Sequence, residues 1–192
     1  SHGDLLKRHF GEDILLKIVG MDAGEINVFD GISAKDDILN SKIENEIIYH
    51  GNDVDAKGLS YVIALAERLP EYKFIIPLHN NNPDILPKNI VFDECSWATG
   101  LKHYVINSRL VLCPSIWSAS IEGALLKSIA FNGNVAVFDS KYGFQNDIPD
   151  DVLLRLNYDL DISADSIRSF MNDNLDYSIK SKKWLNKYYS GL

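Results

Sequence analysis

Residues 110–138 read LVLCPSIWSASIEGALLKSIAFNGNVAVF, and this stretch decides the fold. It opens and closes on short apolar runs, LVLC (110–113) and NVAVF (134–138), which are typical of buried strands. Between these runs we expect a helix over about residues 121–132, with Gly133 as its C-cap. A strand, a helix and a second strand in this order are typical of parallel neighbours joined by a crossover helix.

The same alternation extends upstream. Three more apolar runs have the character of strands: EIIYH (46–50), KFIIPL (73–78) and NIVFD (89–93). Apolar side chains at helical spacing follow the first and third of these runs: Leu59, Val62, Ile63, Ala66 and Leu69, and then Leu101, Tyr104 and Val105. The resulting order of strands and helices predicts an α/β domain with a mostly parallel sheet.

The two ends of the chain are less regular. Residues 1–44 hold one short helical pattern at 5–10 and an acidic, polar connector, so we expect a segment separate from the domain at 45–192. Towards the C-terminus, polar residues at 159–165 suggest turns. A helix that ends in KKWLNKYY (182–189) is expected to follow them.

Acidic side chains outnumber basic ones. Among 192 residues there are 27 Asp and Glu against 19 Lys and Arg, a formal net charge of -8, and no basic run interrupts this balance. A general nucleic-acid-binding protein would carry a basic face, so that class is excluded. An anionic small ligand is not excluded, because one lysine and a helix N-terminus can bind a phosphate.

Cysteine and histidine residues give no sign of a disulfide or a metal site. The two cysteines, Cys95 and Cys113, lie in apolar surroundings without a CxxC spacing, which indicates reduced thiols of an intracellular protein. Neither His50 nor His79 has a second histidine or a carboxylate at the spacing of metal ligands. No signal peptide and no apolar stretch of about 18 residues is present, so we expect a cytoplasmic chain without a transmembrane segment.

The segment after the first predicted strand is a candidate phosphate site. In open parallel sheets, ligands bind beyond the carboxyl ends of the strands. Residues 50–58 read HGNDVDAKG, so Gly51 permits a tight turn, and Lys57 and Gly58 enter a helix. A lysine at this place can reach a phosphate that also faces backbone N–H groups. The alternative is that Lys57 is a solvated residue of the first helical turn.

The segment after the fourth predicted strand is a second candidate. Residues 114–115, Pro-Ser, form a rigid exit, and Ser118 or Ser120 can cap the helix that follows. The free N–H groups of residues 121–123 would then point into the cleft as an anion site. Simple capping explains the serines equally well, and the helix dipole explains Glu122 in the first turn.

Four ordered segments match a known family. They are Gly51 to Gly58; Asn89-Ile90-Val91-Phe92; Tyr104 followed by NSRLVLCPS at 107–115; and Asn134-Val135-Ala136-Val137-Phe138-Asp139. In this order they resemble the C-terminal, nucleotide-sugar-binding domain of GT-B-type retaining glycosyltransferases, the large group 1 family, over about residues 45–189. The resemblance implies a three-layer Rossmann-like sheet with helices on both faces, which is one half of a GT-B fold.

The candidate site residues follow from these segments and this resemblance. Donor and phosphate contacts are expected at Gly51, Asn52, Lys57, Ser120, Ile121, Glu122, Gly123 and Lys127. Base and cleft contacts are expected at Glu94, Cys95, Ser96, Pro114, Ser115 and Trp117. The family reaction needs no metal, and no cofactor is implied.

Several family positions hold other residues. Asn52 takes the place of the phosphate-binding arginine, so Lys57 alone remains of that cationic pair. The two glutamates of the family's E-x7-E motif fall on Ala119 and Lys127. Lys127 could instead meet a phosphate or pair with Glu122, and Glu122 is the candidate relocated carboxylate and catalytic residue.

The resemblance implies a donor-binding domain of a retaining glycosyltransferase. Such an enzyme transfers a sugar from a nucleoside diphosphate sugar to a saccharide or lipid-linked acceptor, as in polysaccharide biosynthesis. Residues 1–44 would be the interdomain crossing, and a missing N-terminal domain would bind the acceptor and could attach peripherally to the inner membrane. Two alternatives stay open: a GT-B-like module that binds a protein or carbohydrate without transferring a sugar, and an epimerase of the GT-B type.

Overall fold

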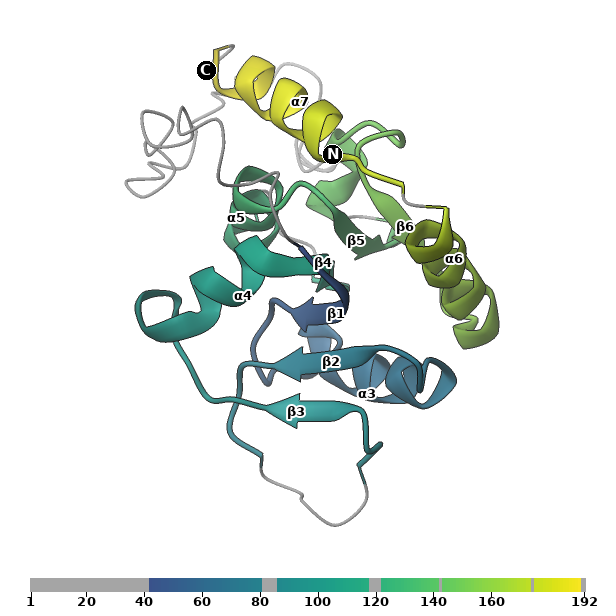
Figure 1. The fold of residues 1–192 in the computed structure, drawn as a ribbon. Helices are drawn as coiled ribbons and strands as arrows, with labels where there is room; N and C mark the ends of the chain where they lie inside the picture. Colours follow the sequence, from purple (N-terminus) through teal and green to yellow (C-terminus); the bar gives the residue numbers. More distant parts are fainter. Residues whose placement is uncertain (1–41, 81–85, 118–121, 142, 174, 191–192) are drawn as a thin grey trace, which may run out of the picture.

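The computed structural model describes residues 42–80, 86–117, 122–141, 143–173 and 175–190. Its centre is a six-stranded sheet in the order β3-β2-β1-β4-β5-β6, in which every neighbouring pair is parallel (Figure 1). The strands are β1 Ile43–Tyr49, β2 Lys73–Ile76, β3 Ile90–Phe92, β4 Ser108–Cys113, β5 Val135–Phe138 and β6 Leu154–Leu156. The predicted parallel α/β sheet is confirmed.

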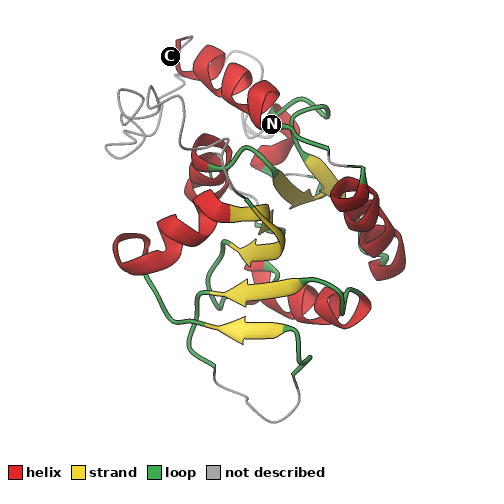
Figure 2. Ribbon diagram, viewed as in Figure 1, coloured by secondary structure: helices red, strands yellow, loops and turns green. Residues whose placement is uncertain are grey.

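Helices cover both faces of the sheet, as Figures 1 and 2 show. One face is covered by α3 (Leu59–Arg68) and α6 (Leu160–Asn172). The other face is covered by α4 (Lys102–Asn107), α5 (Gly123–Phe131) and α7 (Ser178–Ser190). Each face has its own apolar core, so the predicted three-layer Rossmann-like architecture is confirmed.

Strand β1 lies inside the sheet and contributes to both cores. Ile47 and Tyr49 belong to the core under α3 and α6, whereas Ile48 belongs to the core under α5. This alternation follows from the two-residue period of a strand. His50, the next residue, continues on the side of Ile48 and contacts Ser128 of α5.

The chain changes direction between β1 and β4. From β1 it proceeds through β2 to β3 at one edge of the sheet, and it then returns to β4 on the other side of β1. The two strands pair in parallel, with Ile48 beside Val111 and Tyr49 beside Leu112. We call the region at the loops after β1 and β4 the crevice, because in folds of this type ligands bind at this place, beyond the carboxyl ends of the strands.

The region before the C-terminal helix differs from the prediction. Strand β6 was not expected, because it has only three residues and the polar Arg155 stands at its centre. The turns predicted at 159–165 are wrong, since α6 begins at Leu160. Asp159 caps this helix by accepting hydrogen bonds from the backbone N–H groups of Asp161 (3.0 Å) and Ile162 (3.1 Å). The polar residues that suggested turns are the cap and the outer face of a helix.

The ends of two other predicted segments also differ. Helix α5 begins at Gly123, two residues later than expected. Gly133 ends it as predicted, with a φ of 85°, and a Cβ there would lie 2.5 Å from the Cα atom of Ser178. Strand β1 begins at Ile43, inside the segment assigned to the interdomain crossing. The rest of that segment, with the helix predicted at 5–10, lies outside the described residues.

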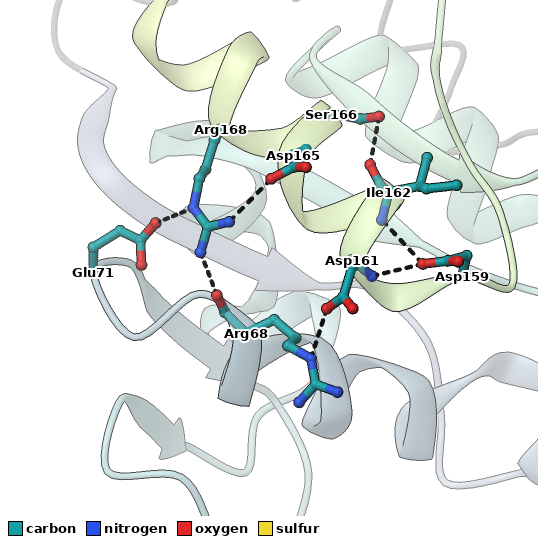
Figure 3. A network of polar contacts seen from close by, with 8 residues as sticks. All are labelled: Arg68, Glu71, Asp159, Asp161, Ile162, Asp165, Ser166 and Arg168. Atoms are coloured by element: carbon teal, nitrogen blue, oxygen red, sulfur yellow. Dashed lines mark hydrogen bonds and ion pairs between the residues drawn. The ribbon is translucent and has the colours of Figure 1, made fainter.

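A network of charged side chains joins α6 to α3 and the turn that follows it (Figure 3). The Arg168 guanidinium lies 2.7 Å from the Glu71 carboxylate and 3.2 Å from that of Asp165, and it donates a hydrogen bond to the carbonyl oxygen of Arg68. Arg68 pairs with Asp161 at 2.8 Å. Burial favours a higher pKa for Glu71, but the hydrogen bond from Arg168, a backbone hydrogen bond and the charge of Arg168 together outweigh burial and lower the pKa.

The Arg168→Ala variant is expected to lose about 0.5–1 kcal/mol of unfolding free energy, because one guanidinium bridges acceptors on α6, on α3 and in the turn after α3. Arg68→Ala is the matched control, since it removes one exposed ion pair and should cost less. Urea denaturation measures both. At high salt the difference between Arg168→Ala and the parent should shrink, and a difference that salt leaves unchanged would contradict the electrostatic explanation.

Candidate functional site

The crevice between β1 and β4 holds a buried ion pair. The Nζ atom of Lys57, in the loop after β1, lies 2.6 Å from Oε1 of Glu122, which directly precedes α5. The same Nζ is 3.3 Å from the Ser115 hydroxyl. The side chains of Lys57 and Glu122 are only 22% and 7% exposed, so Lys57 is not the solvated residue of the alternative interpretation. The structure thus joins two segments that the sequence placed at the ends of different strands.

The loop after β1 is held in place by backbone contacts. The Tyr49 hydroxyl donates hydrogen bonds to the carbonyl oxygens of Asn52 (2.7 Å) and Lys57 (3.1 Å). A Cβ atom at Gly51 would lie 2.3 Å from this hydroxyl, so only glycine leaves room for it. Asn52 is exposed, and its side chain accepts a hydrogen bond from the N–H of Val54. Gly51 and Asn52 therefore shape the loop that carries Lys57.

The loops after β1 and β4 also contact each other directly. The N–H group of Ile116 donates to the carbonyl oxygen of Ala56 at 2.9 Å. Gly58 has a φ of 82°, and a Cβ there would lie 2.5 Å from the carbonyl oxygen of Pro114. The Ser115 hydroxyl accepts from the N–H of Trp117. Pro114 and Ser115 consequently lie beside Lys57 and Gly58.

The N-terminus of α5 lies beside Lys57, and among the described residues no side chain caps it. Glu122 occupies the N-cap position, and its carboxylate pairs with Lys57 instead of accepting from the first-turn N–H groups. The helix starts at Gly123, so Glu122 lies before the first turn and not within it, as the sequence had suggested. Ser120 and Ile121, with the alternative cap Ser118, lie outside the described residues.

The predicted base and cleft residues fall into two groups. Glu94, Cys95 and Ser96 line a cavity of about 550 Å³ at the carboxyl ends of β1 to β3. Asp53 and His79 line the same cavity, and His79 lies 3.2 Å from Glu94. Trp117, by contrast, is 50% exposed, and Lys57 Nζ lies 5.8 Å from the centre of its ring. Trp117 therefore lies near Lys57 and is not a core residue.

A cluster behind the crevice was not identified from the sequence. The ring of His50 stacks on Trp97 at 5.5 Å, and its Nδ1 atom lies 2.8 Å from the Ser128 hydroxyl in α5. The Nζ atom of Lys127 lies over the Trp97 ring, 4.8 Å from its centre. Burial, followed by the charge of Lys127, lowers the pKa of His50 to about 4. One signal in the sequence could have found this cluster. His50 directly follows β1, and the two-residue period of a strand places its side chain on the same buried face as Ile48.

Of the two roles suggested for Lys127, the pair with Glu122 does not form, because Glu122 makes its ion pair with Lys57. The Lys127 ammonium lies over the ring of Trp97. Because α5 turns about 100° per residue, positions 122 and 127 lie on different faces, which explains the outcome. The phosphate contact of Lys127 stays a prediction.

The described ranges contain neither a cluster of metal-binding side chains nor a membrane-spanning helix. Within these ranges, no three His, Cys, Asp or Glu side chains are close enough to hold a metal ion. Among the helices of this part of the chain, none is both long and apolar enough to cross a bilayer. Cys95 and Cys113 are both free thiols.

Two solved structures are similar to this fold. The crystal structure of TarM aligns with a TM-score of 0.62 at 19% sequence identity, covering 78% of this chain and 33% of TarM. The pneumococcal O-GlcNAc transferase GtfA, in complex with UDP and GlcNAc, aligns with a TM-score of 0.55 at 17% identity, covering 79% of this chain and 36% of GtfA. No protein-family model and no curated protein matches the sequence.

TarM and GtfA are both GT-B glycosyltransferases, and they define the class of fold. The chain has the fold of one Rossmann-like domain of such a protein. It spans about a third of the length of either structure, as one domain of a GT-B architecture would. The resemblance to the GT-B fold, drawn from the sequence, is confirmed.

The buried ion pair makes a prediction about stability. Lys57→Ala should lower the free energy of unfolding by about 2 kcal/mol, because it leaves the Glu122 carboxylate buried without its cation. The double variant Lys57→Met/Glu122→Gln should recover most of this loss, since it removes both charges. Thermal and urea denaturation of the three proteins measure the effect. Equal losses in the single and double variants would contradict a coupled pair.

His50 makes a prediction about pH. Its pKa of about 4 lies below the ordinary value of 6.5, so between these values the unfolded chain binds a proton that the folded chain does not. Stability present above pH 6.5 is therefore lost as the pH falls towards 4, by at most about 3 kcal/mol. His50→Gln should flatten this part of the stability profile relative to the parent.

The matched control for this experiment is His103→Gln, which replaces an exposed histidine of α4. Solvent reaches that side chain in the folded and unfolded states, so its variant should follow the parent profile. The carboxylates titrate in all three proteins and cancel in the differences. An unchanged slope in His50→Gln would mean that His50 is not held neutral by the fold.

Proposed function

We propose that this chain is the donor-binding domain of a glycosyltransferase, which binds the nucleoside diphosphate of an activated sugar in the crevice between β1 and β4. The observation that carries the proposal is Lys57 beside the N-terminus of α5, at the point where the strand order reverses. A lysine and a helix N-terminus together form an anion site in which the first-turn N–H groups and the ammonium face the same phosphate.

The nucleoside would extend from this phosphate site towards the cavity of Glu94, Cys95 and Ser96. That cavity is about 550 Å³ and lies at the ends of β1 to β3, on the same edge of the sheet as Lys57. The GtfA structure, which holds UDP and GlcNAc, makes UDP the first nucleotide to test. Gly123 supplies one of the first backbone N–H groups of α5, and Ser115 and Trp117 border the phosphate site.

Glu122 sets a condition on donor binding. Its carboxylate already neutralises Lys57, so an incoming diphosphate competes with it for the ammonium. Displacement is favoured electrostatically, because a diphosphate carries more negative charge than one carboxylate and also reaches the N–H groups of α5. Glu122 released in this way would lie beside the leaving group, where it is the candidate catalytic carboxylate.

The complete reaction requires more than this chain. In the proposed enzyme, a further domain, at the N-terminal side, binds the saccharide or lipid-linked acceptor across the crevice. The diphosphate leaving group is stabilised by Lys57 and by the start of α5, and the anomeric configuration is retained. Residues 1–44 would connect the two domains. Because this chain covers about a third of TarM and GtfA, donor binding is the step that the chain can perform alone.

A second candidate is a GT-B-like module that binds a partner without transferring a sugar. The specific observation that favours it is the ion pair, in which Glu122 already neutralises the Lys57 ammonium that a phosphate would need. This module would keep the fold and the ion pair as structural features and would not bind nucleotides.

Calorimetric titration of the 192-residue chain with UDP, GDP, dTDP, CDP and ADP distinguishes the two candidates. We expect micromolar to low-millimolar binding of one nucleotide. Lys57→Ala should weaken this binding by roughly tenfold or more, the usual effect of losing one charge-assisted hydrogen bond to phosphate. Lys57→Arg should retain much of the affinity because it keeps the charge.

Lys183→Ala is the control, since Lys183 is an exposed lysine of α7 far along the chain from the crevice. Its affinity should equal that of the parent. Circular dichroism of every variant separates loss of binding from loss of folding. Silence of the parent with all five nucleotides would overturn the proposal in favour of the binding module.

A further inference from the structure

The hydroxyl group of Ser128 has all its hydrogen-bonding capacity used. It lies 2.8 Å from the carbonyl oxygen of Ala124, which can only accept, so the single hydroxyl hydrogen points there. Its two remaining contacts, with Nδ1 of His50 at 2.8 Å and with the Cys113 sulfur at 3.3 Å, must then be contacts in which Ser128 accepts. Burial raises the pKa of Cys113 to about 12, so its thiol is protonated and can donate.

This arrangement fixes the tautomer of His50. Because Ser128 accepts from Nδ1, the ring proton is on Nδ1, and in a neutral imidazole the other nitrogen, Nε2, is then a hydrogen-bond acceptor. The low pKa of His50, about 4, keeps the ring neutral at physiological pH. His50 is thus a buried histidine that carries a lone pair on Nε2 and no charge.

Nε2 has no hydrogen-bond partner among the residues that the structure describes. His50 is 8% exposed. The fully buried polar atoms that lack a partner do not include Nε2, so this atom lies on the small part of the ring that solvent still reaches. It also points away from Ser128, because the two nitrogens occupy opposite sides of the ring.

The position of His50 relates it to both ends of a bound nucleotide. Through Ser128 it contacts α5, whose N-terminus forms the phosphate site with Lys57. Through its stacking on Trp97 it contacts the segment that directly follows Ser96, which lines the cavity assigned to the base. In a nucleoside diphosphate, the group between the base and the phosphates is the ribose.

We propose that Nε2 of His50 accepts a hydrogen bond from a ribose hydroxyl of the nucleotide, with Ser128 as the residue that positions the ring. This inference rests on the proposed donor-binding function. A hydroxyl is the chemical partner that fits, because a neutral acceptor gains nothing from a phosphate, which has no proton to donate at neutral pH. The nearby charge of Lys127 helps to keep the imidazole unprotonated and therefore an acceptor.

The test compares UDP with 2′-deoxy-UDP and 3′-deoxy-UDP by calorimetric titration of the 192-residue chain. The parent should bind UDP roughly fivefold more tightly than the analogue that lacks the hydroxyl in question, the usual effect of one hydrogen bond. His50→Phe keeps an aromatic ring for Trp97 but removes the acceptor, and it should bind UDP and both analogues equally. His103→Phe, at an exposed histidine, should keep the preference of the parent.

A measurement on the parent protein avoids any dependence on folding of the variant. In a long-range ¹H–¹⁵N NMR spectrum, the proton of the His50 ring should reside on Nδ1, and the Nε2 signal should move when UDP is added. With the deoxy analogue that the parent binds more weakly than UDP, the Nε2 signal should not move, because that analogue lacks the hydroxyl that His50 contacts.

The outcomes separate the two proposals. If the parent does not bind UDP or any other nucleotide, the donor-binding function fails, and this inference fails with it. If UDP binds, Lys57→Ala weakens this binding, and the parent does not distinguish UDP from either analogue, then only the role of His50 is overturned. A preference that persists in His50→Phe would assign the hydroxyl to another residue and would overturn the role of His50 as well.

Discussion

The parallel pairing of β1 with β4 is the constraint on which the rest of the molecule depends. Two crossovers start from this pair and proceed to opposite faces of the sheet, one through α3 and one through α5. A slip of one residue in β1 would exchange the side chains of its two faces, so that Tyr49 could not support the loop of Lys57. The register therefore fixes the fold and the crevice together.

The ion pair of Lys57 and Glu122 is a consequence of that register. Each residue follows a different strand, and the two meet because their loops contact each other through Ile116 and Ala56. A buried ion pair costs much of its attraction in lost hydration, so its presence is poorly explained by stability alone. The proposed anion site would explain why the pair lies beside the start of α5.

The two faces of the crevice contribute different chemistry. On one side, Lys57 and α5 offer positive charge, which suits phosphates. The second part is an uncharged cluster of His50, Ser128 and Trp97. The Ser128 hydroxyl fixes the direction of its hydrogen bonds. An acidic chain with net charge -8 can hold such a site, because the favourable charges are local.

The sequence by itself determined five of the six strands, the stop of α5 at Gly133 and the GT-B type of fold, because buried strands and glycine helix ends have strong local patterns. It missed β6, which is three residues long, and it misread the cap of α6 as a turn. It named Lys57 and Glu122 separately but could not pair them, since they are 65 residues apart. It weighed His50 only as a metal ligand and could not connect it with Ser128, which is 78 residues away. Only tertiary packing brings the ends of different strands to one crevice, and local sequence carries no information about such distant contacts.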